Sequence, residues 1–132
     1  MKKIITLLLL LNSFFLFSQS NEKQNENLIY DSNSINVKPE FPEGLENLNT
    51  FLIKTGIKAK TKKEEKTETK MFAMFVVEKD GSLSDVKVLG KVESGRAEEL
   101  KKVLMDLPKW IPGKQNGTIV RVLYVLPLLY NN

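Results

Sequence analysis

The chain has 132 residues, which suits a single domain and is too short for two sizeable ones. Charged residues make up 27% and apolar residues 42%, a balance typical of a globular protein rather than a disordered one. Histidine and cysteine are both absent, which excludes Ser-His-Asp and Cys-His nucleophile relays, zinc sites built from these residues, and disulfides. We therefore expect a protein that is not an enzyme, with no catalytic residues, no metal and no cofactor.

The N-terminus carries the pattern of a secretory signal peptide. Two lysines precede apolar stretches at residues 4–11 and 14–17, and small polar residues follow at positions 18–20. The apolar run is shorter than the ~20 residues of a membrane-spanning helix. We predict a cleaved signal peptide at residues 1–20 and a periplasmic protein, in preference to an uncleaved inner-membrane anchor. Membrane contact is expected only if this segment stays attached.

The charge balance argues against nucleic acid as a partner. The 20 basic residues exceed the 16 acidic ones by only four, and two of the basic residues lie in the predicted signal peptide. A nucleic-acid-binding protein usually has a larger and more clustered basic excess. We therefore expect the partners to be proteins.

The mature chain begins with a polar leader and continues as one domain. Residues 21–36 are rich in asparagine and almost free of apolar periodicity, so they predict a disordered leader before a domain at residues 37–132. Leucines at helical spacing then predict a short amphipathic helix over about residues 43–54. The hydrophilic residues 54–70, which mix lysines with glutamates, predict a solvated loop or a frayed helix.

The clearest local pattern is a β-hairpin. The apolar run at residues 71–77 leads through Asp80-Gly81, a tight-turn signal, into the alternating segment 83–89. The first of these strands is apolar on both faces, which favours a central position in a sheet, whereas the second has the alternation of an edge strand.

A second helix and a last strand complete the domain. Apolar residues at helical spacing over about residues 97–107 predict a helix, with Ser94 as its candidate N-cap and Pro108 as its stop. Residues 118–126 predict a long strand that is also apolar on both faces, with Pro127 at its end.

These elements predict an α+β fold with a three-stranded antiparallel or mixed sheet and two helices on one face. A right-handed crossover after the hairpin places the last strand beside the first, in the spatial order 2-1-3. The last strand is then a long edge with unpaired backbone groups, to which another strand can be added. A partner's peptide, the leader or a second copy of the chain could cover this edge, or it could stay bare, and the pattern leaves these alternatives open.

Four segments, in this order and spacing, resemble the TonB C-terminal domain family. They are residues 37–44 (VKPEFPEG), 75–89 (FVVEKDGSLSDVKVL), 107–117 (LPKWIPGKQNG) and 120–130 (VRVLYVLPLLY). The resemblance covers about residues 35–130 and implies the same fold as the periodicity. In that family a periplasmic domain grips a short segment of an outer-membrane receptor, the TonB box, which pairs with the last strand of the sheet.

Carried over to this chain, the resemblance implies a role in TonB-dependent outer-membrane transport. The implied partner is a TonB-dependent receptor or another envelope protein, and Arg121 and Tyr124 are the implied side-chain contacts. The implied partner-binding edge consists of Ile119, Val120, Arg121, Val122, Leu123, Tyr124 and Val125.

An alternative hypothesis keeps the fold without energy transduction. Transducers of the family have an uncleaved membrane helix and a long proline-rich spacer, whereas this leader spans under ~65 Å even when fully extended. The alternative is a stand-alone periplasmic protein-interaction module, or a homodimer formed through the same edge.

The remaining polar and aromatic candidates have simpler interpretations. Glu78, Asp80 and Asp85 fit a turn and an exposed strand end better than a metal or acid–base site, which needs several convergent carboxylates. Trp110 lies between two prolines, and we expect it to pack over an edge of the core rather than to stack on a ligand.

Overall fold

The structure is a computed structural model that describes residues 27–131. The predicted signal peptide and the first part of the leader lie outside these residues. No helix within residues 27–131 is long and apolar enough to cross a membrane. The elements in chain order are β1 (Ile29–Asp31), α2 (Leu45–Leu52), the 3₁₀ turn η1 (Ile53–Thr55), β2 (Ile57–Ala59), the 3₁₀ turn η2 (Lys62–Glu64), β3 (Met71–Val77), β4 (Leu83–Gly90), α3 (Ser94–Met105), β5 (Gly113–Gln115) and β6 (Thr118–Tyr130).

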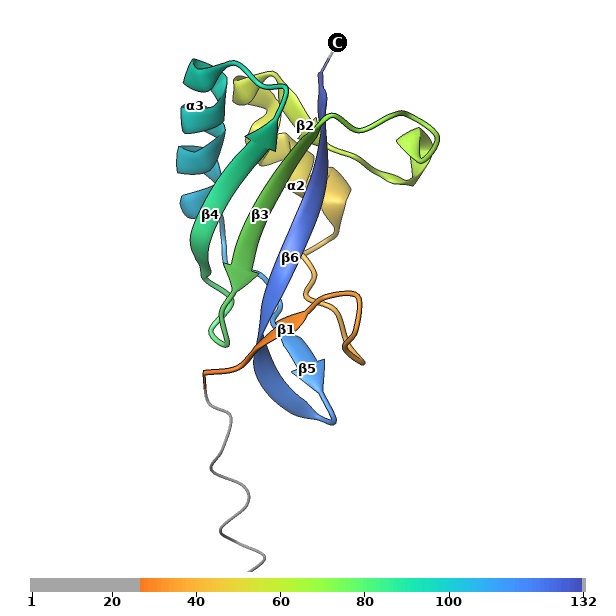
Figure 1. The fold of residues 1–132 in the computed structure, drawn as a ribbon, viewed down its shortest axis with the longest axis vertical. Coiled ribbons are helices and arrows are strands. Elements are labelled where there is room, and N and C mark those ends of the chain that lie inside the picture. The colour runs from red at the N-terminus through yellow and green to blue at the C-terminus, as the bar shows by residue number, and fades with distance from the viewer. Residues whose placement is uncertain (1–26, 132) are drawn as a thin grey trace, which may run out of the picture.

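The sheet is mixed and is built around β6, which runs along most of the molecule (Figure 1). The main strand order is β1-β6-β3-β4, and β2 and β5 also pair with β6. The predicted neighbours β4, β3 and β6 therefore lie in the predicted order. The predicted number of three strands is wrong, because the sheet has six within residues 27–131. The three extra strands have three residues each, too few for a hydrophobic period to reveal them.

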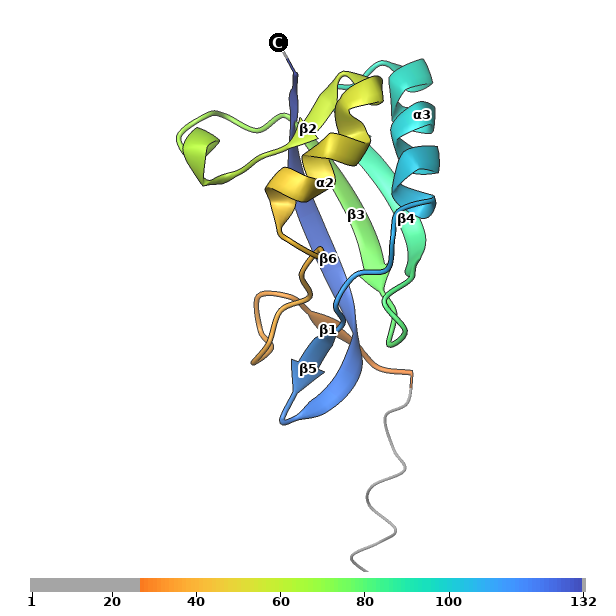
Figure 2. The ribbon, with the colours of Figure 1, turned by 180° about the vertical axis from the view of Figure 1, so that it is seen from behind.

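Both helices cover the same face of the sheet, as predicted, and they lie in front of it in Figure 2. Helix α2 buries Leu48 and Leu52, which are four residues apart on one side of the helix. Gly56 ends this segment with a φ of 72° and donates its N–H to the carbonyl of Ile53. A residue without a Cβ adopts this left-handed conformation at little cost.

Helix α3 matches the prediction closely at its C-terminal end. It buries Leu100 and Leu104 and ends before Pro108. At the other end the N-cap is Glu93, not Ser94, and the Glu93 side chain makes no capping hydrogen bond.

One hydrophobic core lies between the helices and the sheet. Phe75 of β3 and Leu126 of β6 are fully buried in it, and Trp110 is 3% exposed. The prediction that Trp110 packs against the core is confirmed. Because the residues of β3 with odd numbers face this core, those with even numbers point to the opposite face of the sheet.

In the turn between β3 and β4, Gly81 has a positive φ and Asp80 does not. Gly81 has a φ of 86° and donates its N–H to the carbonyl of Glu78, while Asp80 accepts hydrogen bonds from the N–H and hydroxyl of Ser82. Further along β4, the register with β3 shifts between Met74 and Val76, at a β-bulge where Asp85 has a φ of 50°.

The lysine- and glutamate-rich segment contains a strand instead of being only a loop or a frayed helix. Its apolar residues Ile57 and Ala59 are fully buried and belong to β2, which pairs antiparallel with the end of β6. After β2, Thr61 and Glu64 form a capping box around η2. A hydrogen bond from Lys58 and another from the Thr61 hydroxyl lower the pKa of Glu64 to about 2.

Residues 27–36, which the sequence predicted to be part of a disordered leader, are ordered in the fold. Strand β1 pairs in parallel with β6, and Ser32 and Ile35 are each only 8% exposed. A turn follows β1, because the N–H of Ser34 donates to the carbonyl of Asp31. The leader therefore contributes a strand to the sheet.

Candidate functional site

Strand β6 has backbone N–H and C=O groups along two edges. The candidate site is the edge that does not pair with β3. One edge pairs with β3 over residues 122–128. Two hydrogen bonds show which backbone groups lie on the other, outer edge. The Ser32 N–H donates to the Leu123 carbonyl (3.1 Å), and the Lys60 N–H donates to the Pro127 carbonyl (2.9 Å). Because backbone groups alternate along a strand, the odd-numbered residues of this region face outward.

The outer edge of β6 is largely covered by the chain's own short strands. Strand β1 pairs with residues 121–123 and β2 with residues 128–130. Between them Val125 pairs with neither strand, and its side chain is 44% exposed. Of the alternatives that the sequence left open, the structure shows the leader covering part of this edge.

The strand also passes through Pro127, where the sequence predicted its end. Residue 127 faces outward, so the missing N–H of proline removes no hydrogen bond between β6 and β3. Its carbonyl still accepts the hydrogen bond from Lys60.

The seven predicted edge residues have different environments. Val120 and Val122 are buried in a small apolar cluster with Ile35, against which Tyr30 of β1 packs. Exposed side chains remain at Ile119 and Val125, whereas those of Arg121, Leu123 and Tyr124 are partly buried.

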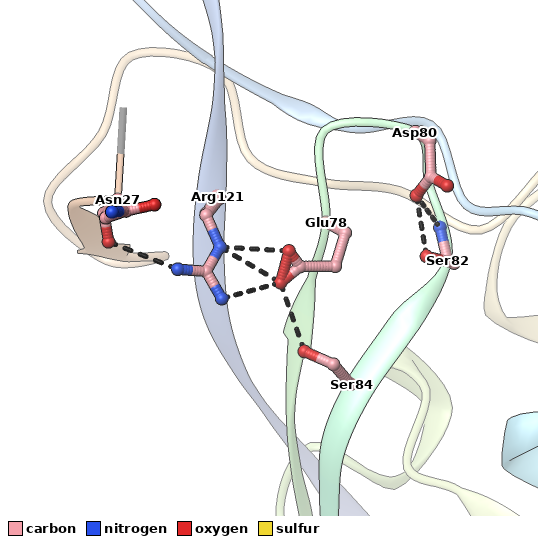
Figure 3. A network of polar contacts seen from close by, with 6 residues as sticks. All are labelled: Asn27, Glu78, Asp80, Ser82, Ser84 and Arg121. Carbon is pink, nitrogen blue, oxygen red and sulfur yellow. Dashed lines mark hydrogen bonds and ion pairs between the residues drawn. The ribbon is translucent and has the colours of Figure 1, made fainter. Parts of the chain in front are cut away.

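Arg121 lies between β1 and the β3–β4 hairpin and binds both (Figure 3). Its Nε and Nη2 donate to the Glu78 carboxylate over distances of 2.8–3.0 Å, and its Nη1 donates to the backbone carbonyl of Asn27 (3.1 Å). Ser84 adds a hydrogen bond to the same carboxylate (3.1 Å). The guanidinium therefore holds the start of β1 through a backbone group rather than through a side chain.

Electrostatics favour the charged forms of this pair. The hydrogen bonds from Arg121 lower the pKa of Glu78, although partial burial acts in the opposite direction. The hydrogen bonds to Glu78 likewise raise the pKa of Arg121. Both groups are charged at neutral pH, and the bidentate geometry fixes the plane of the guanidinium.

Tyr124, the other predicted contact residue, is part of an aromatic cluster on the helix side of the sheet. Its ring stacks on Phe75 with centroids 5.5 Å apart and lies 5.3 Å from the ring of Trp110. Burial, with a smaller effect of the Glu40 carboxylate, raises the pKa of Tyr124. The Trp110 ring also contacts Phe41, at 5.4 Å. Tyr124 therefore supports the strand from the helix side rather than presenting a free side chain at the edge.

The hairpin carboxylates have local partners. Asp80 accepts hydrogen bonds from Ser82, and these lower the pKa of Asp80. Asp85 lies at the bulge, with Lys87 3.9 Å away. Within residues 27–131 no group of three acidic side chains is placed to hold a metal ion.

The face of the sheet opposite the helices is a second apolar surface, and it is not among the predicted binding sites. Register places Phe72 beside Pro127, Met74 beside Val125, and Val76, itself only 3% exposed, beside Leu123. Leu89 of β4 flanks Phe72 and is 47% exposed. No helix of the described chain covers this face (Figure 1). The signal was present in the sequence, because both β3 and β6 are apolar at odd and even positions alike.

Comparisons with known proteins give no independent identification. The chain matches no family model, no curated protein and no solved structure.

Proposed function

We propose that this chain is an exported, TonB C-terminal-like domain that binds proteins of the cell envelope through the outer edge of β6, in association with TonB-dependent outer-membrane transport. The partner segment is extended and adds to β6 as a strand. Backbone hydrogen bonds give the affinity in this mode of recognition, and alternate side chains give the selectivity.

The observation that carries the proposal is the pairing of β1. An extended segment from outside the helix–sheet core already lies along residues 121–123, parallel to β6. Arg121 holds this segment by a backbone carbonyl, which any peptide sequence has. Next to it, Val125 is paired by neither β1 nor β2. This edge can therefore accept a strand, and it is not sealed along its length.

The test is peptide binding to the full mature chain, measured by fluorescence anisotropy. The probe is a labelled synthetic peptide that copies the TonB box of an outer-membrane receptor. We expect Val125→Pro to weaken binding by about tenfold or more, because it removes the outward N–H and replaces it with a ring that blocks approach. Val125→Ala keeps the N–H and is expected to bind within about threefold of the wild type.

One further variant, Lys63→Ala, makes this test specific. Lys63→Ala changes an exposed side chain far from β6 in the sequence and should bind like the wild type. Val122→Pro is unsuitable, because residue 122 faces β3 and the variant would damage the sheet itself. Equal affinity of Val125→Pro and Val125→Ala would contradict binding at this edge.

A second candidate function is a homodimer, and the apolar face of the sheet favours it. Two such faces can pack against each other as in a β-sandwich, and a second copy supplies an identical face. Sedimentation equilibrium would then show a dimer for the wild type and a monomer for Leu89→Lys, which places a charge on this face. A wild-type chain that stays monomeric at all concentrations would exclude this candidate.

A further inference from the structure

We propose that β1 occupies the place of the partner strand, so that a partner must displace the leader of this chain before it can bind. This inference rests on the proposed function and adds its regulation and the chemistry of the partner segment. The partner is an extended peptide that runs parallel to β6 and presents apolar side chains opposite Val122 and Leu123.

The first argument is that β1 is held by few interactions. It has only three residues, and alternation leaves Tyr30 as the one residue within it whose N–H and carbonyl both face β6. The Ser32 N–H donates to the Leu123 carbonyl, and Arg121 donates to the Asn27 carbonyl. Leu28 and Ile29 remain 45% and 42% exposed. A short edge strand with so little burial belongs to the least stable parts of a fold.

The second argument concerns the side chains of β1. Tyr30 packs on the apolar cluster that contains Val122, so this position suits an aromatic or large apolar residue. The next residue is Asp31, which lies beside Leu123 on the apolar face of the sheet. A carboxylate there gains nothing from the apolar surface. A partner with a leucine or valine at that position would bury Leu123 and bind more favourably.

The third argument is that the remaining contacts do not depend on sequence. Arg121 donates to a backbone carbonyl, and its hydrogen bonds to Glu78 do not involve any atom of β1. A longer peptide would also reach Val125, which β1 does not. The edge can therefore pair with a strand that continues beyond β1. The apparent affinity for that strand equals the intrinsic affinity multiplied by the fraction of molecules in which β1 is detached.

The first experiment releases β1 by a single substitution. The probe is a labelled peptide that copies residues 27–33 (NLIYDSN), with a second version carrying leucine in place of Asp31. Ser32→Pro removes the N–H that bonds to Leu123, whereas the matched control Ile29→Pro changes an N–H that faces away from β6. We expect Ser32→Pro to bind both peptides about tenfold more tightly than Ile29→Pro or the wild type. The leucine version should bind more tightly than the native copy.

The second experiment locks β1 in place and does not depend on weakening the fold. The chain has no cysteine, so Asp31→Cys with Leu123→Cys introduces the only two thiols, at paired positions of adjacent strands. The oxidised protein should lose peptide binding, and reduction of the same sample should restore it. Leu123→Cys alone should bind equally under both conditions.

The outcomes separate this inference from the proposed function. If the oxidised and reduced proteins bind the peptides equally, β1 is not a competitor and the inference is wrong, while binding at an edge remains. If Ser32→Pro binds no more tightly than Ile29→Pro, the inference is also wrong. If neither the released nor the reduced protein binds these peptides or the TonB-box peptide, the proposed function fails together with the inference.

Discussion

Arg121, which is predicted to contact a partner, also links β6 to the hairpin between β3 and β4 through Glu78. Its partner Glu78 lies 43 positions away in the chain, at the end of a different strand. Their pairing follows from the register of β3 with β6 and from the turn that follows β3. Sequence patterns locate strands, but they do not fix which charged side chains meet across them, so this ion pair could not be predicted.

The ion pair predicts a pH dependence of stability. The pKa of Glu78 is lowered in the folded protein, so the pair stabilises the fold above the ordinary carboxyl pKa of 4.5, and this stabilisation is lost as the pH falls through the lowered value. We expect Glu78→Gln to lower the melting temperature by a few degrees at pH 7. The difference from the wild type should shrink as the pH falls below 4.5 and through the lowered pKa of Glu78, as measured by circular dichroism.

The control for this experiment is Asp85→Asn. Asp85 is an exposed carboxylate on the same hairpin, and its distance of 3.9 Å from Lys87 is too long for a hydrogen bond. Its effect on the melting temperature at pH 7 should be small. A Glu78→Gln deficit that does not shrink as the pH falls below 4.5, up to the point of acid unfolding, would show that the carboxylate charge is not the cause.

A second prediction at the residue scale compares two glycines. A Cβ at Gly81 would lie 2.1 Å from the carbonyl oxygen of Trp110, and the φ of 86° disfavours any other residue. Gly81→Ala should therefore reduce the free energy of unfolding by about 2 kcal/mol or more. Gly95 lies in the first turn of α3, where a Cβ would meet no neighbouring atom within 4 Å, so Gly95→Ala should be neutral or stabilise by up to about 1 kcal/mol.

Chemical denaturation measures both effects under one set of conditions. Similar changes for the two variants would contradict the role assigned to the positive φ of Gly81 and to its close approach to Trp110.

At the scale of elements, the sequence predicts those that bury a long apolar pattern. Strands β3 and β6 and both helices fall in this class, and a hairpin followed by a crossover is enough to order the three main strands. Strand β2 could have been suspected, because Ile57 and Ala59 alternate within a polar segment. Strand β1 has no such pattern, since its place depends on backbone pairing and on Tyr30 alone.

Helix α3 offers a prediction about capping. Its N-cap Glu93 has extended backbone angles but makes no side-chain hydrogen bond to the first turn. Glu93→Ser supplies a side chain of the right length, and we expect it to raise the free energy of unfolding by about 1 kcal/mol. Glu98→Ser, at an exposed position within the helix, should give no gain. A gain of equal size at both positions would show that removal of negative charge is the cause.

At the scale of the whole molecule, the sheet is covered by helices on one face only. The sequence carries a sign of this arrangement, because β3 and β6 are apolar on both faces; that pattern predicts a central position for β3, and it does not by itself predict an uncovered face. The same residues also leave an apolar face without a helix. Periodicity shows that two faces are apolar, and it does not show how many layers the fold supplies to cover them.

The predicted export of the protein can be tested by mass. We expect the protein purified from the periplasmic fraction to begin near Gln19 or Asn21, because the small residues at positions 18–20 suit signal cleavage. Intact-mass spectrometry of fractionated cells measures this directly. A full-length mass in the inner-membrane fraction would instead support an anchored protein, in which the leader connects the domain to the membrane.

Pro127 limits how far any added strand can extend along β6. The outward position after Val125 is this proline, which has no N–H to donate, and its carbonyl is already bonded to Lys60. Strand β2 occupies the positions that follow. Complete pairing is therefore confined to the stretch from Arg121 to Val125, and a peptide that extends beyond it gains no further backbone hydrogen bonds to β6. The same limit makes the outer edge of β6 a poor template for stacking further chains, because pairing along it cannot be extended.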